Sequence, residues 1–182
     1  MSTETVSTST GTIPSPQIVH QPTSGAVVVG LDGSEGSRGA LEVACDEAQL
    51  RGLPIAAAMA WTPPEVWVTP YPMVPSAHDM HAAAIVLATT EIREVLEARS
   101  RRGASTPVVE LVAASGPAAV VLERLSAGAT MLVVGHRGRG AVASRLIGSV
   151  GLSTVVHARC SVLIVRAPHE GRPGDEHESH AT

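Results

Sequence analysis

The sequence contains almost no aromatic residues and lacks phenylalanine, lysine and asparagine altogether. Aromatic residues make up 2% of the 182 positions, so any core must be built from aliphatic side chains. Modules that bind single-stranded nucleic acids stack bases on aromatic rings, and this composition argues against that class. The formal net charge of −4 provides no general basic field for a phosphate polymer. We therefore expect no nucleic-acid partner.

The absence of lysine excludes several kinds of catalytic site, because all 13 basic residues are arginine. A P-loop requires Gly-Lys-Ser/Thr, and Schiff-base chemistry and the protein-kinase site also depend on lysine. Neither Gly-x-Ser-x-Gly nor His-Glu-x-x-His occurs in the chain, so the usual nucleophile and zinc-protease motifs are missing. We predict no catalytic residue and no dedicated metal ligand.

Cysteines and long apolar runs are also scarce. Cys45 and Cys160 have neither Cys-x-x-Cys nor zinc-site spacing, which favours two buried thiols in a reducing compartment. No apolar run approaches the roughly 20 residues of a membrane span, and the first residues lack the basic start and apolar stretch of a signal peptide. We expect a cytoplasmic protein with no membrane partner.

The pattern along the chain predicts one α/β domain over residues 25–167. Residues 1–24 and 168–182 are polar and rich in Pro, Gly or charge, and both are predicted to be disordered. Between them, short apolar runs alternate with helical patterns, which indicates a doubly wound, Rossmann-like parallel sheet with helices on both faces. The expected strands are 26–31, 55–61, 108–113, 130–135 and 161–166, and the expected helices are 35–51, 79–102, 117–127 and 149–157.

The loop after the fourth expected strand carries the clearest binding motif. Gly135, Gly138, Gly148 and Ser149 form the spacing Gly-x2-Gly-x9-Gly-Ser. Glycine lets backbone N–H groups approach an anion closely, and a helix N-terminus attracts phosphate. Ser149 either caps the helix that starts there or donates its hydroxyl to a terminal phosphate. In sheets of this kind, ligands bind beyond the carboxyl ends of the strands, where this loop begins.

Two charged residues complete the candidate site. Arg137, inside the glycine-rich loop, supplies positive charge that lysine provides in other phosphate sites. Asp32 ends the first strand and precedes a glycine, so it either forms an Asx-turn or contacts a ligand. The combination of this carboxylate with the glycine spacing favours the ligand role.

These motifs resemble the ATP-binding branch of the universal stress protein family over residues 25–167. The segment VVVGLDGSEGSRGAL is similar to that family's first strand and loop, and GSVGLSTVVHARCSVLIVR to its last helix and strand. The resemblance implies a five-stranded sheet of order 3-2-1-4-5, with ATP and Mg²⁺ or Mn²⁺ over the first and fourth strands. Where the family usually has Ser, Thr or Ala, this chain has Gly151, which removes a hydroxyl contact.

The same resemblance assigns roles to single residues. Asp32 would hold the nucleoside, the backbone near Ala60 would meet the adenine, and the loop would cradle the ribose and phosphates. The loop residues are Gly135, Arg137, Gly138, Gly148 and Ser149. Trp61 and Trp67 either flank the adenine or fill apolar surface.

Together these features predict an ATP-binding stress-response regulatory protein that acts through nucleotide-dependent conformation and contacts with another regulatory protein. The alternatives are a slow ATP-hydrolysing or adenylate-forming enzyme of the same architecture, and a scaffold without a ligand. The last strand is an apolar edge strand, which predicts a homodimer, and the resemblance implies antiparallel pairing across a two-fold axis. Its residues are Val162, Leu163, Ile164 and Val165.

Overall fold

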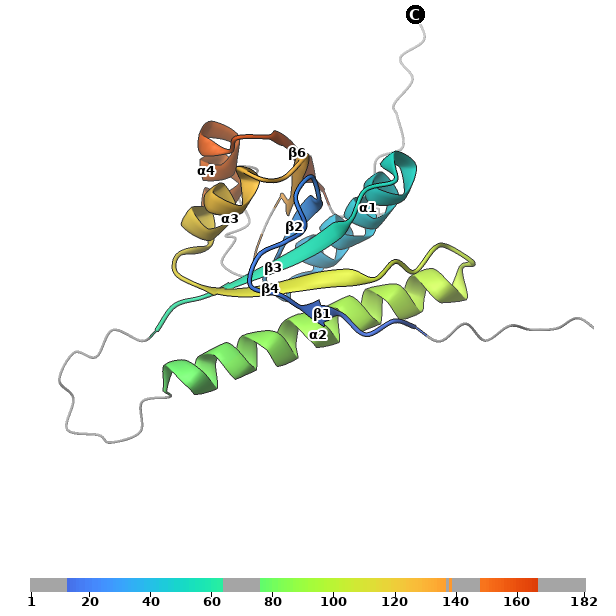
Figure 1. Cartoon of the computed structure of the whole chain (residues 1–182), viewed down its shortest axis with the longest axis horizontal. Coiled ribbons are helices and arrows are strands. Elements are labelled where there is room, and N and C mark those ends of the chain that lie inside the picture. Colours follow the sequence, from blue (N-terminus) through green and yellow to red (C-terminus); the bar gives the residue numbers. More distant parts are fainter. Residues whose placement is uncertain (1–12, 64–75, 137, 139–147, 167–182) are drawn as a thin grey trace, which may run out of the picture.

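The computed structural model describes residues 13–63, 76–136, 138 and 148–166. Helices and strands alternate along the chain after a short first strand (Figure 1). The strands are β1 (Gln17–Ile18), β2 (Val27–Leu31), β3 (Ile55–Trp61), β4 (Val109–Ser115), β5 (Met131–Gly135) and β6 (Ser161–Val165). The helices are α1 (Glu35–Arg51), α2 (Ala77–Arg101), α3 (Ala118–Ser126) and α4 (Ser149–His157).

All strands form one parallel sheet in the order β1-β4-β3-β2-β5-β6. The five strands expected from the sequence are present in the predicted order, and the predicted count of five was one too low because β1 adds a sixth. The central strand β2 pairs with β3 on one side and with β5 on the other. The chain therefore reverses direction across the sheet between β3 and β5, and this reversal opens a crevice at the carboxyl ends of β2 and β5.

The lead predicted to be disordered is ordered in its described part, residues 13–24. Gln17 and Ile18 pair with Glu110 and Leu111 of β4, and the backbone N–H of Thr23 donates to the Glu110 carboxylate at 2.7 Å. Without β1, β4 would be an edge strand with a row of unpaired amide groups, and a short covering strand removes that exposure. Residues 1–12 and 167–182 lie outside the described part of the chain.

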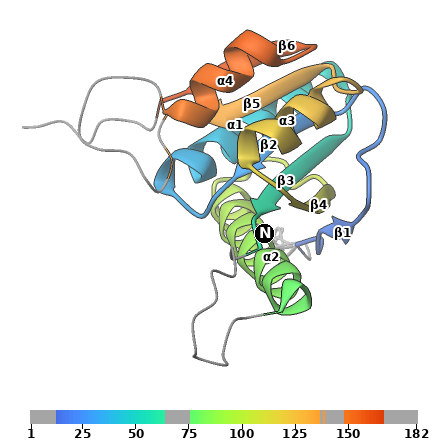
Figure 2. The same cartoon turned by 90° about the vertical axis from the view of Figure 1, so that its left-hand side faces the viewer.

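Alternating side chains of the sheet form two separate cores. Val27 and Val29 of β2 face the core beneath α1 and α2, whereas Val28 faces the core beneath α3 and α4. Figure 2 shows these two helix pairs on opposite sides of the sheet. Because both faces are covered, the strands are apolar at nearly every position, as parallel strands buried on both faces require.

The helix boundaries follow from capping residues. The Ser34 side chain accepts a hydrogen bond from the Ser37 backbone N–H at 3.2 Å and starts α1, and Gly52 ends it in the left-handed conformation with φ of 64°. The second helix starts at Ala77, two residues before the position expected from the sequence, because Ser76 and Asp79 form a capping box. The hydrogen bonds that Asp79 accepts from the side chain and backbone of Ser76 lower the pKa of the Asp79 carboxyl.

A buried arginine joins α1 to α2. The Arg99 side chain is 2% exposed and donates to the Asp46 carboxylate at 2.7 Å, to the Ser105 carbonyl at 2.9 Å and to the Glu42 carbonyl at 3.2 Å. Three acceptors around one guanidinium compensate its loss of hydration. This contact fixes α2 against α1.

We predict that Arg99→Ala lowers the free energy of unfolding by about 3 kcal/mol, because the packing of the buried side chain and its three hydrogen bonds are lost. Asp46→Asn should cost less than about 1 kcal/mol, since the Asp46 side chain is 68% exposed and water can replace the contact. Urea unfolding followed by far-UV circular dichroism measures both values. Equal losses in the two variants would contradict a role for the buried arginine beyond a surface ion pair.

Candidate functional site

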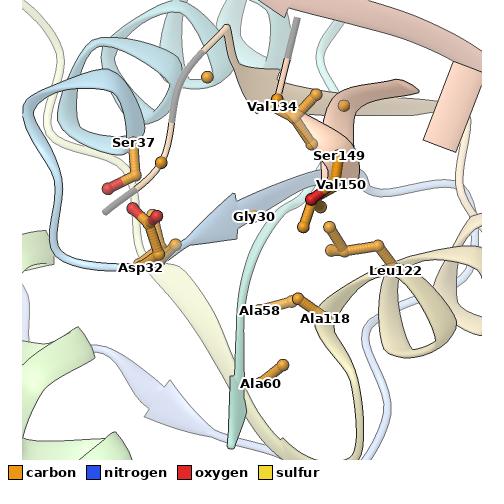
Figure 3. A pocket seen from close by; sticks show the side chains of 15 residues that line it. Gly30, Asp32, Ser37, Ala58, Ala60, Ala118, Leu122, Val134, Ser149 and Val150 are labelled. Atoms are coloured by element: carbon orange, nitrogen blue, oxygen red, sulfur yellow. The ribbon is translucent and has the colours of Figure 1, made fainter. Parts of the chain in front are cut away.

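A cavity of about 300 Å³ opens at the carboxyl ends of β2, β3 and β5, beside the first turns of α3 and α4. It contains six of the seven binding residues predicted from the sequence; Arg137 lies outside the described residues. The six are Asp32, Ala60, Gly135, Gly138, Gly148 and Ser149. Figure 3 shows Asp32 and Ser37 on one side of the cavity, with Leu122, Ser149 and Val150 on the opposite side.

Small residues on one face of the sheet make room for the cavity. Gly30, Ala58 and Ala60 lie on the face toward α3 and α4, at alternate positions of two neighbouring strands. A methyl group at Gly30 would come within 3.1 Å of Leu122 and 3.5 Å of Val134, so even alanine would crowd this floor. The result is an apolar slot with polar groups at its rim, the usual composition of a small-molecule site.

Asp32 forms the Asx-turn that the sequence suggested and also lies at the cavity. One carboxylate oxygen accepts a hydrogen bond from the Ser34 backbone N–H at 3.0 Å, the contact of an Asx-turn. The same side chain lines the cavity. The turn therefore fixes the direction in which the carboxylate faces the cavity, so the Asx-turn does not exclude a ligand role.

The three glycines of the motif differ in how much space their surroundings leave for a side chain. A Cβ at Gly135 would lie 2.7 Å from the backbone carbon and oxygen of Gly36, so β5 can approach the start of α1 only with glycine at this position. A Cβ at Gly138 would collide with the Asp32 carboxylate. A Cβ at Gly148 would meet only the His136 carbonyl, at an ordinary 3.7 Å. Packing thus explains Gly135, whereas Gly138 keeps space free beside Asp32.

The start of α4 faces the cavity. Gly148 is the N-cap residue and Ser149 is the first residue of the helix, so the alternative that Ser149 caps the helix was wrong. No side chain bonds to this helix terminus at the cap, and helix N-termini favour anions. The Gly148 N–H donates to the His136 carbonyl at 3.1 Å, and the His136 N–H donates to Val165 at 2.6 Å. The first bond holds the two ends of the glycine-rich loop together, and the second ties the start of the loop to the end of β6.

Sequence reasoning missed a buried carboxyl group beneath the loop that follows β2. Glu91 of α2 is 1% exposed; it accepts a hydrogen bond from the Gly33 backbone N–H at 3.0 Å and shares a second hydrogen bond with the Ser37 hydroxyl. Burial raises the pKa of the Glu91 carboxyl, the neighbouring Asp32 raises it further, and the two hydrogen bonds and Arg38 oppose this shift. Acidic residues in helices usually face water, so only the tertiary packing reveals this position.

Trp61 does not line the cavity, and Trp67 lies outside the described residues. The Trp61 ring packs against the core under α1 and α2, with its centroid 5.9 Å from that of His81. Filling apolar surface, one of the two roles expected for Trp61, is therefore the one that the structure supports.

Within the described ranges, no three His, Cys, Asp or Glu side chains converge to hold a metal ion. None of the helices described is long and apolar enough to cross a membrane.

Comparisons with known proteins give one family. The model of the universal stress protein family matches residues 24–166. The universal stress protein Rv2005c of Mycobacterium tuberculosis is 36% identical over 154 residues, covering 85% of this chain and 48% of its own length. Rv2623 of the same organism is 34% identical over 149 residues, covering 82% and 48%. The chain therefore spans about half the length of these curated relatives.

Solved structures agree with the fold. A universal stress protein in complex with cAMP matches with a TM-score of 0.56 and 27% identity, over 81% of this chain and all of the other. A universal stress protein from Archaeoglobus fulgidus in complex with dAMP has a TM-score of 0.51 over 77% of this chain and 96% of its own. At 19% identity the second structure supports the fold alone.

We predict that Gly135→Ala destabilises the protein even without a ligand, by about 1–3 kcal/mol, because its methyl group must displace the backbone of α1. Gly148→Ala should change the free energy of unfolding by less than about 1 kcal/mol, since its Cβ has room. Urea unfolding of both variants provides the comparison. If Gly135→Ala were as stable as the wild type, the close approach of β5 to α1 would be disproved.

Proposed function

The chain belongs to the universal stress protein family, and from this membership and the shape of the cavity we propose that it binds ATP. The observation that carries the proposal is the convergence of Asp32, Gly138 and Ser149, distant in sequence, on one cavity at the switch point of the sheet. The relative solved with cAMP, an adenine nucleotide, supports the same class of ligand.

The two ends of the cavity suit the two parts of a nucleotide. The slot over Ala58 and Ala60 is lined by small apolar side chains, which suits a purine ring. Gly148 and Ser149 form a helix N-terminus at the other end of the cavity, and a helix N-terminus stabilises phosphate. Asp32 lies between the start of α1 and Gly138 and is available to a ribose hydroxyl or to a cation. A volume of about 300 Å³ is at the lower end for ligand pockets, enough for the nucleoside with the phosphates toward the rim.

Mg²⁺ or Mn²⁺ is expected to accompany the nucleotide. Magnesium usually binds through substrate phosphates and one or two carboxylates, and Asp32 is a carboxylate at the cavity wall.

We propose that bound ATP regulates contacts of this cytoplasmic protein with another protein, with hydrolysis absent or slow. The alternative, an ATP-hydrolysing or adenylate-forming enzyme, requires a positioned base and charge stabilisation at the transferring group. Steady-state phosphate release at or above about one per second would favour that alternative.

Calorimetry with ATP and Mg²⁺ tests the binding proposal. We predict binding to the wild type and loss of at least about tenfold in affinity in Asp32→Ala, since a hydrogen bond or ion contact is removed. Gly138→Val should abolish binding, because its side chain occupies the space beside Asp32. Ala129→Ser, a change in the turn before β5 and outside the cavity, serves as the matched control. Absence of heat and of a thermal shift at millimolar ATP would disprove the proposal.

A homodimer through β6 is the second part of the proposal. β6 is an edge strand of the sheet, and four of its five residues are partly exposed. Leu152, Val155 and Val156 of the adjacent α4 are more than half exposed, which extends the apolar surface. The Val165 carbonyl accepts from His136, so it points toward β5. Because peptide groups alternate along a strand, the amide of Ile164 points to the open edge.

We predict that Ile164→Pro breaks the dimer, because proline removes a donor from the open edge while leaving the pairing with β5 in place. Ile164→Glu should also do so, but this side chain packs against the core under α3 and α4 and its folding must be monitored by circular dichroism. Light scattering gives the mass. A wild-type mass near 18.7 kDa at micromolar concentration would contradict the dimer.

A further inference from the structure

One hydroxyl group beneath the loop of residues 32–34, the Asp32 loop, faces two acceptors. The Ser37 Oγ lies 2.9 Å from the Ser34 carbonyl oxygen and also forms a hydrogen bond with Glu91 Oε1. A serine hydroxyl has a single proton and can donate to only one of them. The Gly33 N–H already donates to the other oxygen of Glu91. The Ser34 carbonyl also accepts from the Arg38 N–H at 3.2 Å. Both contacts of the Ser37 hydroxyl can be hydrogen bonds at the same time when Glu91 itself contributes a proton.

We propose that Glu91 is a positioning residue that carries a proton and holds the Asp32 loop in the shape that binds the nucleotide. The protonated carboxyl donates to Ser37, Ser37 donates to the Ser34 carbonyl, and Gly33 donates to the remaining Glu91 oxygen. Ser34 in turn caps α1 and donates its N–H to Asp32. The proposal rests on the proposed nucleotide site, whose wall contains Asp32 and Ser37.

The surroundings of Glu91 favour the neutral form. The side chain is 1% exposed, and ionising a carboxyl there has a high desolvation cost. Two charged groups act on it from the packed elements: Asp32 disfavours the charged form, and Arg38 of α1 favours it. Arg38 is itself half exposed and pairs with Glu94 at 3.3 Å, so its effect on Glu91 is screened. The resulting pKa of Glu91 lies above the ordinary value.

The proton links nucleotide binding to pH. A nucleotide bound without a divalent cation adds negative charge near Asp32 and raises the pKa of Glu91 further, so the coupling is measured with ATP in the absence of Mg²⁺. Binding then takes up a proton, so affinity is greatest below the Glu91 pKa of the free protein and falls as pH rises through the pKa of the complex. Each pKa unit by which the nucleotide shifts Glu91 appears as about a tenfold change in affinity.

Glu91→Gln provides the decisive variant because an amide reproduces the proposed contacts without a proton to lose. Its oxygen accepts from Gly33 and its NH₂ group donates to Ser37. We predict that this variant keeps wild-type affinity for ATP at low pH and that its affinity falls less steeply than that of the wild type between about pH 5 and 8. Glu91→Ala should bind about tenfold more weakly throughout, because Gly33 and Ser37 lose their partner. Glu97→Gln, an exposed change on the same helix, should titrate like the wild type.

Two measurements without nucleotide separate this proposal from the proposed function. The side-chain carboxyl ¹³C signal of Glu91 should titrate above the ordinary glutamate value of 4.5. The free energy of unfolding of the wild type, relative to Glu91→Gln, should fall as pH rises through the Glu91 pKa. A carboxyl signal that titrates at or below the ordinary value would overturn the proposal even if ATP binds. Parallel affinity profiles of the wild type and Glu91→Gln would overturn the coupling. Loss of ATP binding in every protein, with a raised Glu91 pKa, would instead contradict the proposed function.

Discussion

The close approach of β5 to the start of α1 determines the geometry of the site. At Gly135 the backbone lies so near that of Gly36 that a Cβ would be 2.7 Å from it. This contact brings the loop after β5 beside the loop after β2, and so brings Gly138 next to Asp32. The parallel pairing of β2 with β5 sets the level at which both loops leave the sheet. The shape of the cavity therefore depends on a backbone contact that tolerates only glycine.

The cavity itself arises from missing side-chain volume. Gly30 and Ala58 leave the carboxyl end of the sheet thinly covered, while Leu122 and Val134 form its apolar boundary. The polar groups around this slot come from the ends of secondary-structure elements: the Asp32 turn after β2 and the N-terminus of α4. Shape and polarity thus have separate origins, the first in the alternation of the strands and the second in the loops.

The sequence predicted the helices, the five main strands and most of the motif residues that line the cavity, because these depend on local patterns. Apolar runs define the buried strands, and Ser34 and Gly52 define the ends of α1. Strand β1 was missed since its two exposed residues have no periodicity, and its order depends on pairing with β4 and on Thr23 contacts with Glu110. Glu91 was missed for a related reason: its burial depends on how α2 packs across α1, which no local pattern encodes.

Methyl resonances in the cavity show whether a nucleotide occupies it. Alanine methyl groups line it at Ala58, Ala60 and Ala118, while those of Ala44 and Ala88 lie in the opposite core. In a ¹³C-methyl spectrum titrated with ATP and Mg²⁺, we expect saturable shifts at the first three residues and little change at the other two. Shifts confined to other surfaces, or none at saturating ATP, would contradict it.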